Sequence, residues 1–329
     1  MTATFSCVWR DGKVTHEDFP LRDLDGLVAD PRNLVWFDLH DPSHETVDDL
    51  ARELSFDFHV VEDALDPGER PKVTRHDHHI FLQAYALSLA EPSGYASRVR
   101  HSRVSAFVVR NALITVRMGD GFDLAALVET WSRDPTLVGY GVGGLLHALL
   151  DQLVDTHYDV IQDLDDGMES LEDMLFDDDL QTSRISRLAY RLRRELVEVR
   201  RLTRPTREVV DAVIRYAREV GWDEGLRGYY EDILDHVLRE AEWTESLRDL
   251  VSSVFETNLS LNDMRLNVVM KKLSAWAAIV AVPTLVTGWF GMNVPYPGYG
   301  VNAGMLAATG GIIVSVIVLF VLFRRHDWL

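Results

Sequence analysis

Two long apolar segments lie close together near the C-terminal end of the chain. The first runs from about Ala275 to Phe290, and the second runs from about Ala303 to Phe323 without a charged residue. A helix that spans a bilayer needs about 20 apolar residues, which the second segment meets and the first meets if its helix begins near Asn267. Residues 291–302 between them contain no Lys, Arg, Asp or Glu. The pattern predicts two membrane helices joined by a short loop.

A helical pattern of apolar positions precedes the first of these segments. From about Gly225, apolar residues recur at intervals of three or four, with one polar member, Thr244, and no proline before Pro283. If this helix continues to Phe290, about 65 residues at ~1.5 Å per residue give a rod near 100 Å. Such a long periodic pattern favours a helical stalk in an oligomer. The positions of the stripe are Leu226, Tyr230, Ile233, Val237, Ala241, Thr244, Leu247, Val251, Phe255 and Leu259.

The first part of the chain has a different pattern, which predicts an α/β domain. Short apolar runs typical of strands occupy residues 35–39, 80–87, 105–109 and 113–116. A helix is expected after the first run, with Asp41 as its cap and Pro42 in its first position. His76, His78 and His79 precede the second run, and we interpret them as part of a turn rather than as metal ligands.

Residues 141–217 are expected to form two helices of opposite charge. Residues 155–179 hold eleven acidic residues and no Lys or Arg, whereas residues 184–207 hold nine arginines. Two antiparallel helices of this kind would attract each other along their length. Alternatively, the acidic helix concentrates cations near a channel mouth.

Composition and charge exclude several classes of function. The net charge of −19 leaves no basic face for a nucleic acid, and Cys7, as the only cysteine, cannot form an intrachain disulfide. The first residues lack the layout of a signal peptide. No nucleophile–base pair, zinc motif or phosphate-binding glycine loop stands out, so we do not expect an enzyme or a cofactor.

The positive charges that flank the two apolar segments predict their orientation. Lys271 and Lys272 precede the first segment and Arg324 and Arg325 follow the second, whereas the connecting loop has none. Because cytoplasmic flanks carry the excess of Lys and Arg, both termini are expected in the cytoplasm and the loop outside. We therefore expect a multi-pass protein of the plasma (inner) membrane.

Phe290-Gly291-Met292-Asn293 at the end of the first apolar segment, a second apolar segment, and a basic tail ending in Trp328-Leu329 resemble the CorA family of divalent-cation channels. The family pattern is usually Tyr-Gly-Met-Asn, so Phe290 is a departure. Residues 62–65 and 70–73 are similar to a stretch of the family's cytoplasmic domain.

The resemblance implies a funnel-shaped homopentamer that imports Mg²⁺ passively, with Co²⁺ and Ni²⁺ as further candidates. Its parts would be a cytoplasmic α/β domain (1–140), a charged helical hairpin (141–224), a stalk helix continuing into the pore-lining helix (225–290), the external loop (291–302), a second membrane helix (303–323) and a basic tail (324–329).

One face of the first membrane helix is expected to line the pore. Its members recur every three or four positions and are small or polar apart from one methionine. Small residues also line ordinary contacts between membrane helices, which is the alternative. The resemblance implies polar rings at Asn267 and Thr284 and a hydrophobic gate at Met270 and Leu273, which would close by dewetting. The remaining members are Ser274, Ala277, Ala281, Gly288 and Gly291.

The tripeptide Gly291-Met292-Asn293 is the predicted selectivity filter. Mg²⁺ gives up its water reluctantly, so a filter can bind the hydrated ion through its outer waters. The amide carbonyl of Asn293, repeated around a symmetry axis, offers neutral acceptors for those waters. Gly291 is expected to end the helix in a conformation that other residues avoid, and Met292 to brace the loop. The loop lacks the acidic residues that often attract Mg²⁺ in the family.

The resemblance also implies a regulatory Mg²⁺ site between neighbouring subunits. Residues 229–236 are similar to the family segment that carries it, so Asp232 is the expected ligand, with Asp235 as a weaker candidate and Glu91 of the adjacent chain as partner. Bound Mg²⁺ would hold the carboxylates together and keep the pore closed.

Two other functions stay open at this point. A ZntB-like zinc transporter of the same fold is compatible with the loop that lacks acidic residues. A membrane scaffold that conducts nothing is compatible with the helices, and the polar stripe on the first span argues against it.

Overall fold

The structure is a computed structural model that describes residues 4–56, 63–66, 68–76, 78–91, 96–175, 182–293, 295, 297 and 299–329. Glu62, Asp77 and three residues of the predicted loop (Val294, Tyr296 and Gly298) lie outside these residues. The chain divides into two compact units, Met1–Val254 and Phe255–Leu329.

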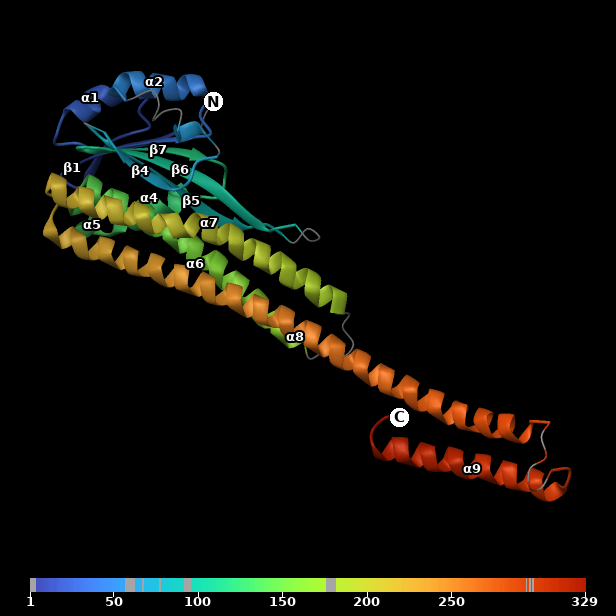
Figure 1. Ribbon diagram of the computed structural model, residues 1–329. Helices are drawn as coiled ribbons and strands as arrows, with labels where there is room; N and C mark the ends of the chain where they lie inside the picture. Colours follow the sequence, from blue (N-terminus) through green and yellow to red (C-terminus); the bar gives the residue numbers. More distant parts are fainter. Residues whose placement is uncertain are drawn as a thin grey trace. The chain divides into compact units, whose positions relative to one another are not determined.

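A seven-stranded sheet in the order β2-β1-β3-β7-β6-β5-β4 forms the centre of the first unit (Figure 1). Only the β3–β7 pair is parallel. The strands are β1 (Thr4–Arg10), β2 (Lys13–Glu17), β3 (Leu34–His40), β4 (Lys72–Arg75), β5 (Ile80–Leu89), β6 (Val99–Val109) and β7 (Ala112–Met118). This arrangement confirms the predicted α/β domain, and the sheet contains each of the four predicted strands.

Helices cover both faces of the sheet, which explains the nearly continuous apolar runs (Figure 1). Val35 and Phe37 of β3 pack in a core with α1 (Leu24–Ala29) and α2 (His44–Leu54). A short 3₁₀ turn, Leu21–Asp23, directly precedes α1. Trp36 belongs to the core on the other face, where α4 (Leu124–Arg133), α5 (Pro135–Gly139), α6 (Val142–Leu175), α7 (Thr182–Val220) and α8 (Glu224–Phe290) contribute residues.

A buried polar network crosses the parallel strand pair. Asp38 is fully buried and accepts hydrogen bonds from the guanidinium of Arg117, the shortest at 2.8 Å from Nη2. Thr115 donates its hydroxyl to Asp38 and accepts a hydrogen bond of 3.1 Å from the indole N–H of Trp36. The network ties β3 to β7 at the register that pairs Asp38 with Thr115.

The start of α2 differs from the prediction. Asp41 is not its cap: Ser43 is, and its hydroxyl accepts the backbone N–H of Thr46. Asp41 instead has a left-handed φ of 45°, and its carboxylate accepts the backbone N–H of Gly119 at 2.9 Å. The turn at the end of β3 therefore uses Asp41 before the helix begins.

The histidine cluster forms the predicted turn, between β4 and β5. The backbone N–H of His76 donates to the carbonyl of His79 at 2.9 Å, and the two rings stack with centroids 4.6 Å apart. His79 is buried against Phe56 rather than solvated.

Helices α6 and α7 pack against each other through apolar residues. Leu164 and Met168 of α6 share a core with Leu192 and Leu196 of α7. Arg200 of α7 forms an ion pair of 3.2 Å with a residue of α8, Glu245.

The long helix predicted from the three- and four-residue spacing is confirmed as α8, with 67 residues. The predicted stripe is buried at Leu226, Tyr230, Ile233, Val237, Thr244, Leu247 and Val251, but Phe255 and Leu259 are 43% and 48% exposed. Glu240 is also buried on this face of α8, although the sequence analysis did not include it in the stripe.

Candidate functional site

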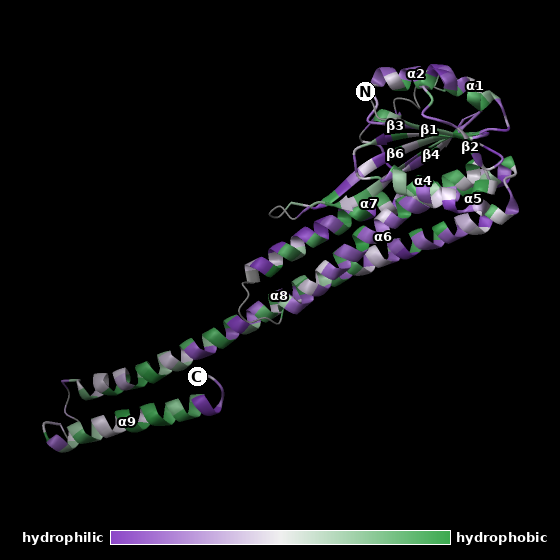
Figure 2. Ribbon diagram, turned by 180° about the vertical axis from the view of Figure 1, so that it is seen from behind, coloured by the Kyte–Doolittle hydropathy of each residue, from purple (hydrophilic) through white to green (hydrophobic). Residues whose placement is uncertain are grey.

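The second unit consists of the C-terminal part of α8 and of α9 (Asn302–Arg325), which runs back antiparallel to it (Figure 1). Both α8 and α9 are long and apolar enough to cross a membrane. Most residues of α9 and many in the C-terminal part of α8 are hydrophobic (Figure 2). Large apolar side chains of both helices are exposed, including Leu285 at 73% and Leu306 at 67%. An apolar surface this extensive marks a membrane or protein contact.

The predicted pore stripe is uncovered in the single chain. All of Asn267, Met270, Leu273, Ser274, Ala277, Ala281, Thr284 and Gly288 are exposed. The buried residues of this segment are Ala275 and Ile279, one turn apart. At about 100° per residue, they lie roughly opposite the centre of the stripe. The face that packs within the chain is therefore not the face predicted to line a pore.

The tripeptide follows directly on α8. The backbone N–H of Gly291 still donates to the carbonyl of Thr287 at 2.9 Å, and that of Met292 to Trp289 at 3.3 Å. The expectation of an unusual backbone at Gly291 is wrong, since it is not among the described glycines with positive φ. A Cβ at this position would lie 2.9 Å from the carbonyl oxygen of Thr287, so crowding is the reason for glycine. Met292 and Asn293 are exposed.

The predicted regulatory residues lie in the first unit and are exposed. Asp232 is 68% exposed, with its Oδ2 3.9 Å from Nε2 of His236 on the next turn. Asp235 forms an ion pair of 2.7 Å with Arg239. Glu91 follows the end of β5 and is exposed. The carboxylate of Asp232 is thus the freer of the two on α8.

Two carboxylates of α6, which the sequence analysis missed, lie close to each other, and the first of them, Asp151, is also near Asp232. Burial raises the pKa of Asp151 against the opposing effect of His236, and the negative charge of Asp232 raises it further. The pKa of Asp155 is also raised, by partial burial and then by the charges of Asp151 and Asp159. Carboxylates that repel one another in this way favour a bound cation. Asp151 and Asp155 are four residues apart on a predicted helix and are therefore neighbours on its surface, which is the sequence feature that could have revealed them.

A separate group of possible metal ligands lies at the end of the parallel strand pair. The ligand atoms of His40, Asp41 and Asp120 lie within 4.8 Å of one another, and no other such group occurs in the described part of the chain. Nε2 of His40 is 3.3 Å from Asp120 and 3.3 Å from the carbonyl oxygen of Gly119. Asp41 and Asp120 are exposed, so the group resembles an ordinary surface ion pair.

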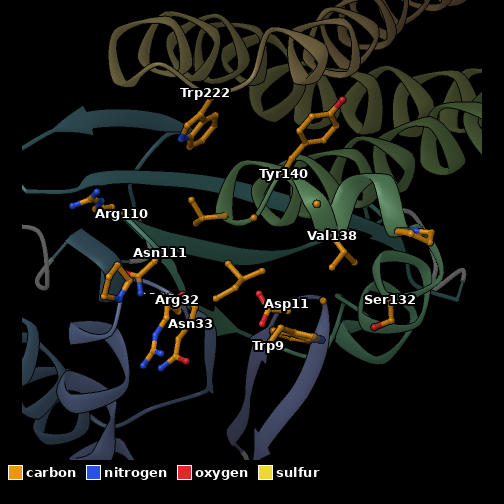
Figure 3. Close-up of a pocket in the computed structure, with 17 residues that line it drawn as sticks. Trp9, Asp11, Arg32, Asn33, Arg110, Asn111, Ser132, Val138, Tyr140 and Trp222 are labelled. Carbon is orange, nitrogen blue, oxygen red and sulfur yellow. Dashed lines mark hydrogen bonds between the residues drawn. The ribbon is translucent and has the colours of Figure 1, made fainter.

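A cavity of about 770 Å³ opens at the other end of the sheet (Figure 3). Trp222 and Tyr140 lie on one side of it, and Trp9 and Asp11 lie on the opposite side. No residue predicted to act in the pore, the filter or the regulatory site lines this cavity.

Comparisons with known proteins agree with this architecture. The family described as "CorA-like Mg²⁺ transporter protein" matches residues 32–325. The chain is 25% identical to a cobalt/magnesium transport protein CorA of Methanocaldococcus jannaschii over 332 residues, which cover 99% of each chain. It is 28% identical to a cobalt/magnesium transport protein CorA of Thermotoga maritima over 279 residues, covering 82% of this chain and 76% of that protein.

A solved structure of a CorA protein from the first of these organisms has a similar fold. The complete structure of the CorA magnesium transporter from M. jannaschii superposes with a TM-score of 0.76 at 22% identity and covers 99% of this chain and 98% of that one. This likeness confirms the predicted combination of an α/β domain, a long helix and a second apolar helix. The family match extends through both apolar helices and the tripeptide between them. The chain therefore belongs to the CorA-like Mg²⁺ transporter family.

Proposed function

We propose that this protein transports Mg²⁺ across a membrane, with Co²⁺ as a second substrate and Ni²⁺ as a further candidate. The observation that carries the proposal is the family match through two apolar helices that enclose Gly291-Met292-Asn293. Transport is passive: a membrane potential contributes about 4.6 kcal/mol per 100 mV to the entry of a divalent ion. Zinc transport is the weaker alternative, because the family and the relatives above are described by magnesium and cobalt.

The conducting assembly in this proposal is a homopentamer in the plasma membrane, with both termini in the cytoplasm. The exposed stripe of small and polar residues supports it, because a stripe opposite the packed face is free to line a shared pore. Five copies of Met270 and Leu273 form the hydrophobic gate, and Asn267 and Thr284 form polar rings. Residues 1–224 belong to the cytoplasmic part, and 303–323 form the outer ring of helices.

The filter in this proposal is a ring of Asn293 side chains. The exposed amide of Asn293 directly after the last turn of α8 supports this role. Neutral carbonyl oxygens bind the water shell of Mg²⁺ without stripping it, and weak binding allows release. Gly291 keeps the last turn tight enough to place Asn293 at the helix end.

Closure of the channel is proposed to depend on Mg²⁺ bound at Asp232, with Asp235 and Glu91 of the neighbouring subunit as secondary ligands. The raised pKa of the nearby Asp151 supports a cation at this place, since burial and the charge of Asp232 both disfavour its ionised form. A bound cation offsets that repulsion.

The proposed function is tested by ion entry into proteoliposomes that contain the purified full chain. Under an inside-negative potential, we expect an Mg²⁺-sensitive dye inside the vesicles to report entry that empty vesicles lack. Zn²⁺ entry without Mg²⁺ entry would assign the protein to zinc transport. If correctly inserted protein admits neither ion, the transport proposal is wrong.

We expect Asp232→Asn to raise the internal Mg²⁺ concentration that closes the channel by about tenfold, equivalent to about 1.4 kcal/mol of binding free energy. The neutral side chain keeps the shape of Asp232 but loses the charge that binds the cation. The measurement is flux at a series of internal Mg²⁺ concentrations. Glu231→Gln is the matched control, because the neighbouring Glu231 is also exposed but is paired with Arg227. Equal closure in all three proteins would exclude Asp232 as a ligand.

A further inference from the structure

Two buried titratable side chains meet between α6 and α8. His157 of α6 is fully buried and Glu240 of α8 is 2% exposed. Nδ1 of His157 lies 3.6 Å from Oε2 of Glu240. Neither carboxylate oxygen of Glu240 has a hydrogen-bond partner within the described residues, and Nδ1 of His157 has none there either. A buried carboxylate left in this state costs free energy.

The other nitrogen of His157 defines where its hydrogen lies. Nε2 is 2.7 Å from the backbone carbonyl oxygen of Tyr85 in β5. A carbonyl oxygen only accepts hydrogen bonds, so Nε2 carries a hydrogen and donates it. In the neutral imidazole, Nδ1 then presents a lone pair to Glu240. An ionised Glu240 would therefore place a second acceptor opposite Nδ1, and a proton between the two removes the conflict.

The surroundings of Glu240 also favour its neutral form. Burial raises the pKa of Glu240, against the opposing effects of His157 and His236, and the charge of Asp155 raises it further. The other charged groups nearby have partners: Arg239 pairs with Asp235, and Arg200 of α7 pairs with Glu245. From β5, the carbonyl oxygen of Tyr85 contacts His157.

A route for a proton is present. Glu240 lines a cavity of about 300 Å³ together with Asp155 and His236, which reach solvent. In the proposal below, a proton that leaves Glu240 reaches water through this cavity.

We propose that His157 and Glu240 form a buried proton-binding site, in which one proton rests on the carboxyl of Glu240, facing the lone pair of Nδ1 of His157, at neutral pH. As the pH rises the proton passes to water, the site changes from neutral to one negative charge, and the contact between α6 and α8 weakens. The site is independent of the proposed transport function.

The pH dependence of stability follows from the ordinary pKa values of about 4.3 for Glu and about 6.5 for His. Between these values the unfolded chain binds one proton, on His157, and the folded chain also binds one. Above about 6.5 the unfolded chain binds none while the folded site keeps its proton. The ratio of folded to unfolded protein attributable to this site then falls by up to about tenfold per pH unit until the site itself titrates.

The test combines infrared spectroscopy and thermal unfolding of the full chain in detergent. We expect the carbonyl absorption of a protonated carboxyl at pH 7, its loss at alkaline pH, and a melting temperature that falls above about pH 6.5. Glu240→Gln should lack the absorption and show a smaller fall, because its neutral amide releases no proton. Glu242→Gln, exposed and two residues further on, should behave like the unchanged protein.

Labelling with ¹³C-glutamate keeps the test decisive if Glu240→Gln does not fold. In the unchanged protein, the label must then shift the carbonyl absorption at pH 7, because that absorption comes from a glutamate. An absorption from protonated Asp151 or Asp155 would not shift with this label. No glutamate-dependent absorption at pH 7, or an identical absorption and pH profile in folded Glu240→Gln, would overturn the proposal.

Discussion

Asn293→Ala is expected to reduce Mg²⁺ entry at least tenfold, because it removes the amide carbonyl that is proposed to bind the ion's water shell. In the proposed assembly each subunit loses one acceptor, so the whole ring of Asn293 side chains loses its polar lining at once. A tenfold effect corresponds to only about 1.4 kcal/mol. The measurement is dye-reported entry into proteoliposomes at a fixed potential, with insertion checked for each variant.

Asn302→Ala is the matched control for this prediction. Asn302 is an exposed residue of the same type at the start of α9, outside the proposed filter. It should leave entry unchanged. If the protein is a membrane scaffold that conducts nothing, flux is absent from the unchanged protein and from both variants. If Asn293→Ala conducts as well as the unchanged protein, Asn293 is not part of the filter.

Asp38→Ala is expected to lower the free energy of unfolding of the α/β unit by about 3–5 kcal/mol. The substitution leaves the guanidinium of Arg117, whose side chain is 11% exposed, without its charged partner. It also removes the acceptor for the hydroxyl of Thr115. The change should appear as a lower unfolding midpoint in denaturant, followed by tryptophan fluorescence.

Two further variants separate charge burial from general disruption. Asp48→Ala, at an exposed position of α2, should change stability by no more than about 0.5 kcal/mol. Adding Arg117→Met to Asp38→Ala should recover part of the loss, since no unpaired charge stays buried. A double variant as unstable as the sum of both single variants would contradict the ion-pair explanation.

The elements that the sequence predicted well have a strong repeating pattern. Helix α8 was predicted because Leu226, Ile233 and Val237 follow the helical spacing and are buried together. The interior strands β3 and β5 were predicted because helices cover both faces of the sheet, so most of their residues are apolar. Strand β2 was missed because all five of its residues are exposed and only one of them, Val14, is apolar.

The contacts made by the site were less predictable than its residues. Asp232 could be named from a resemblance, but its proximity to Asp151 depends on how α6 and α8 pack. The same holds for His157 and Glu240, which are 83 positions apart in the numbering and meet only in the folded chain. Spacing along one helix predicts a face, whereas the partner of that face is decided by tertiary packing.

Strand β2 leaves one edge of the sheet open, and this has a consequence for solubility. An open edge presents unpaired backbone groups to which a strand of another molecule can add. Here the edge strand is only five residues long, carries Lys13 and Glu17, and pairs with β1 through an irregular register between Val8 and Trp9. Short length, charge and a bulge each oppose edge-to-edge aggregation. The α/β unit is thereby protected from sheet extension when it is crowded against other copies.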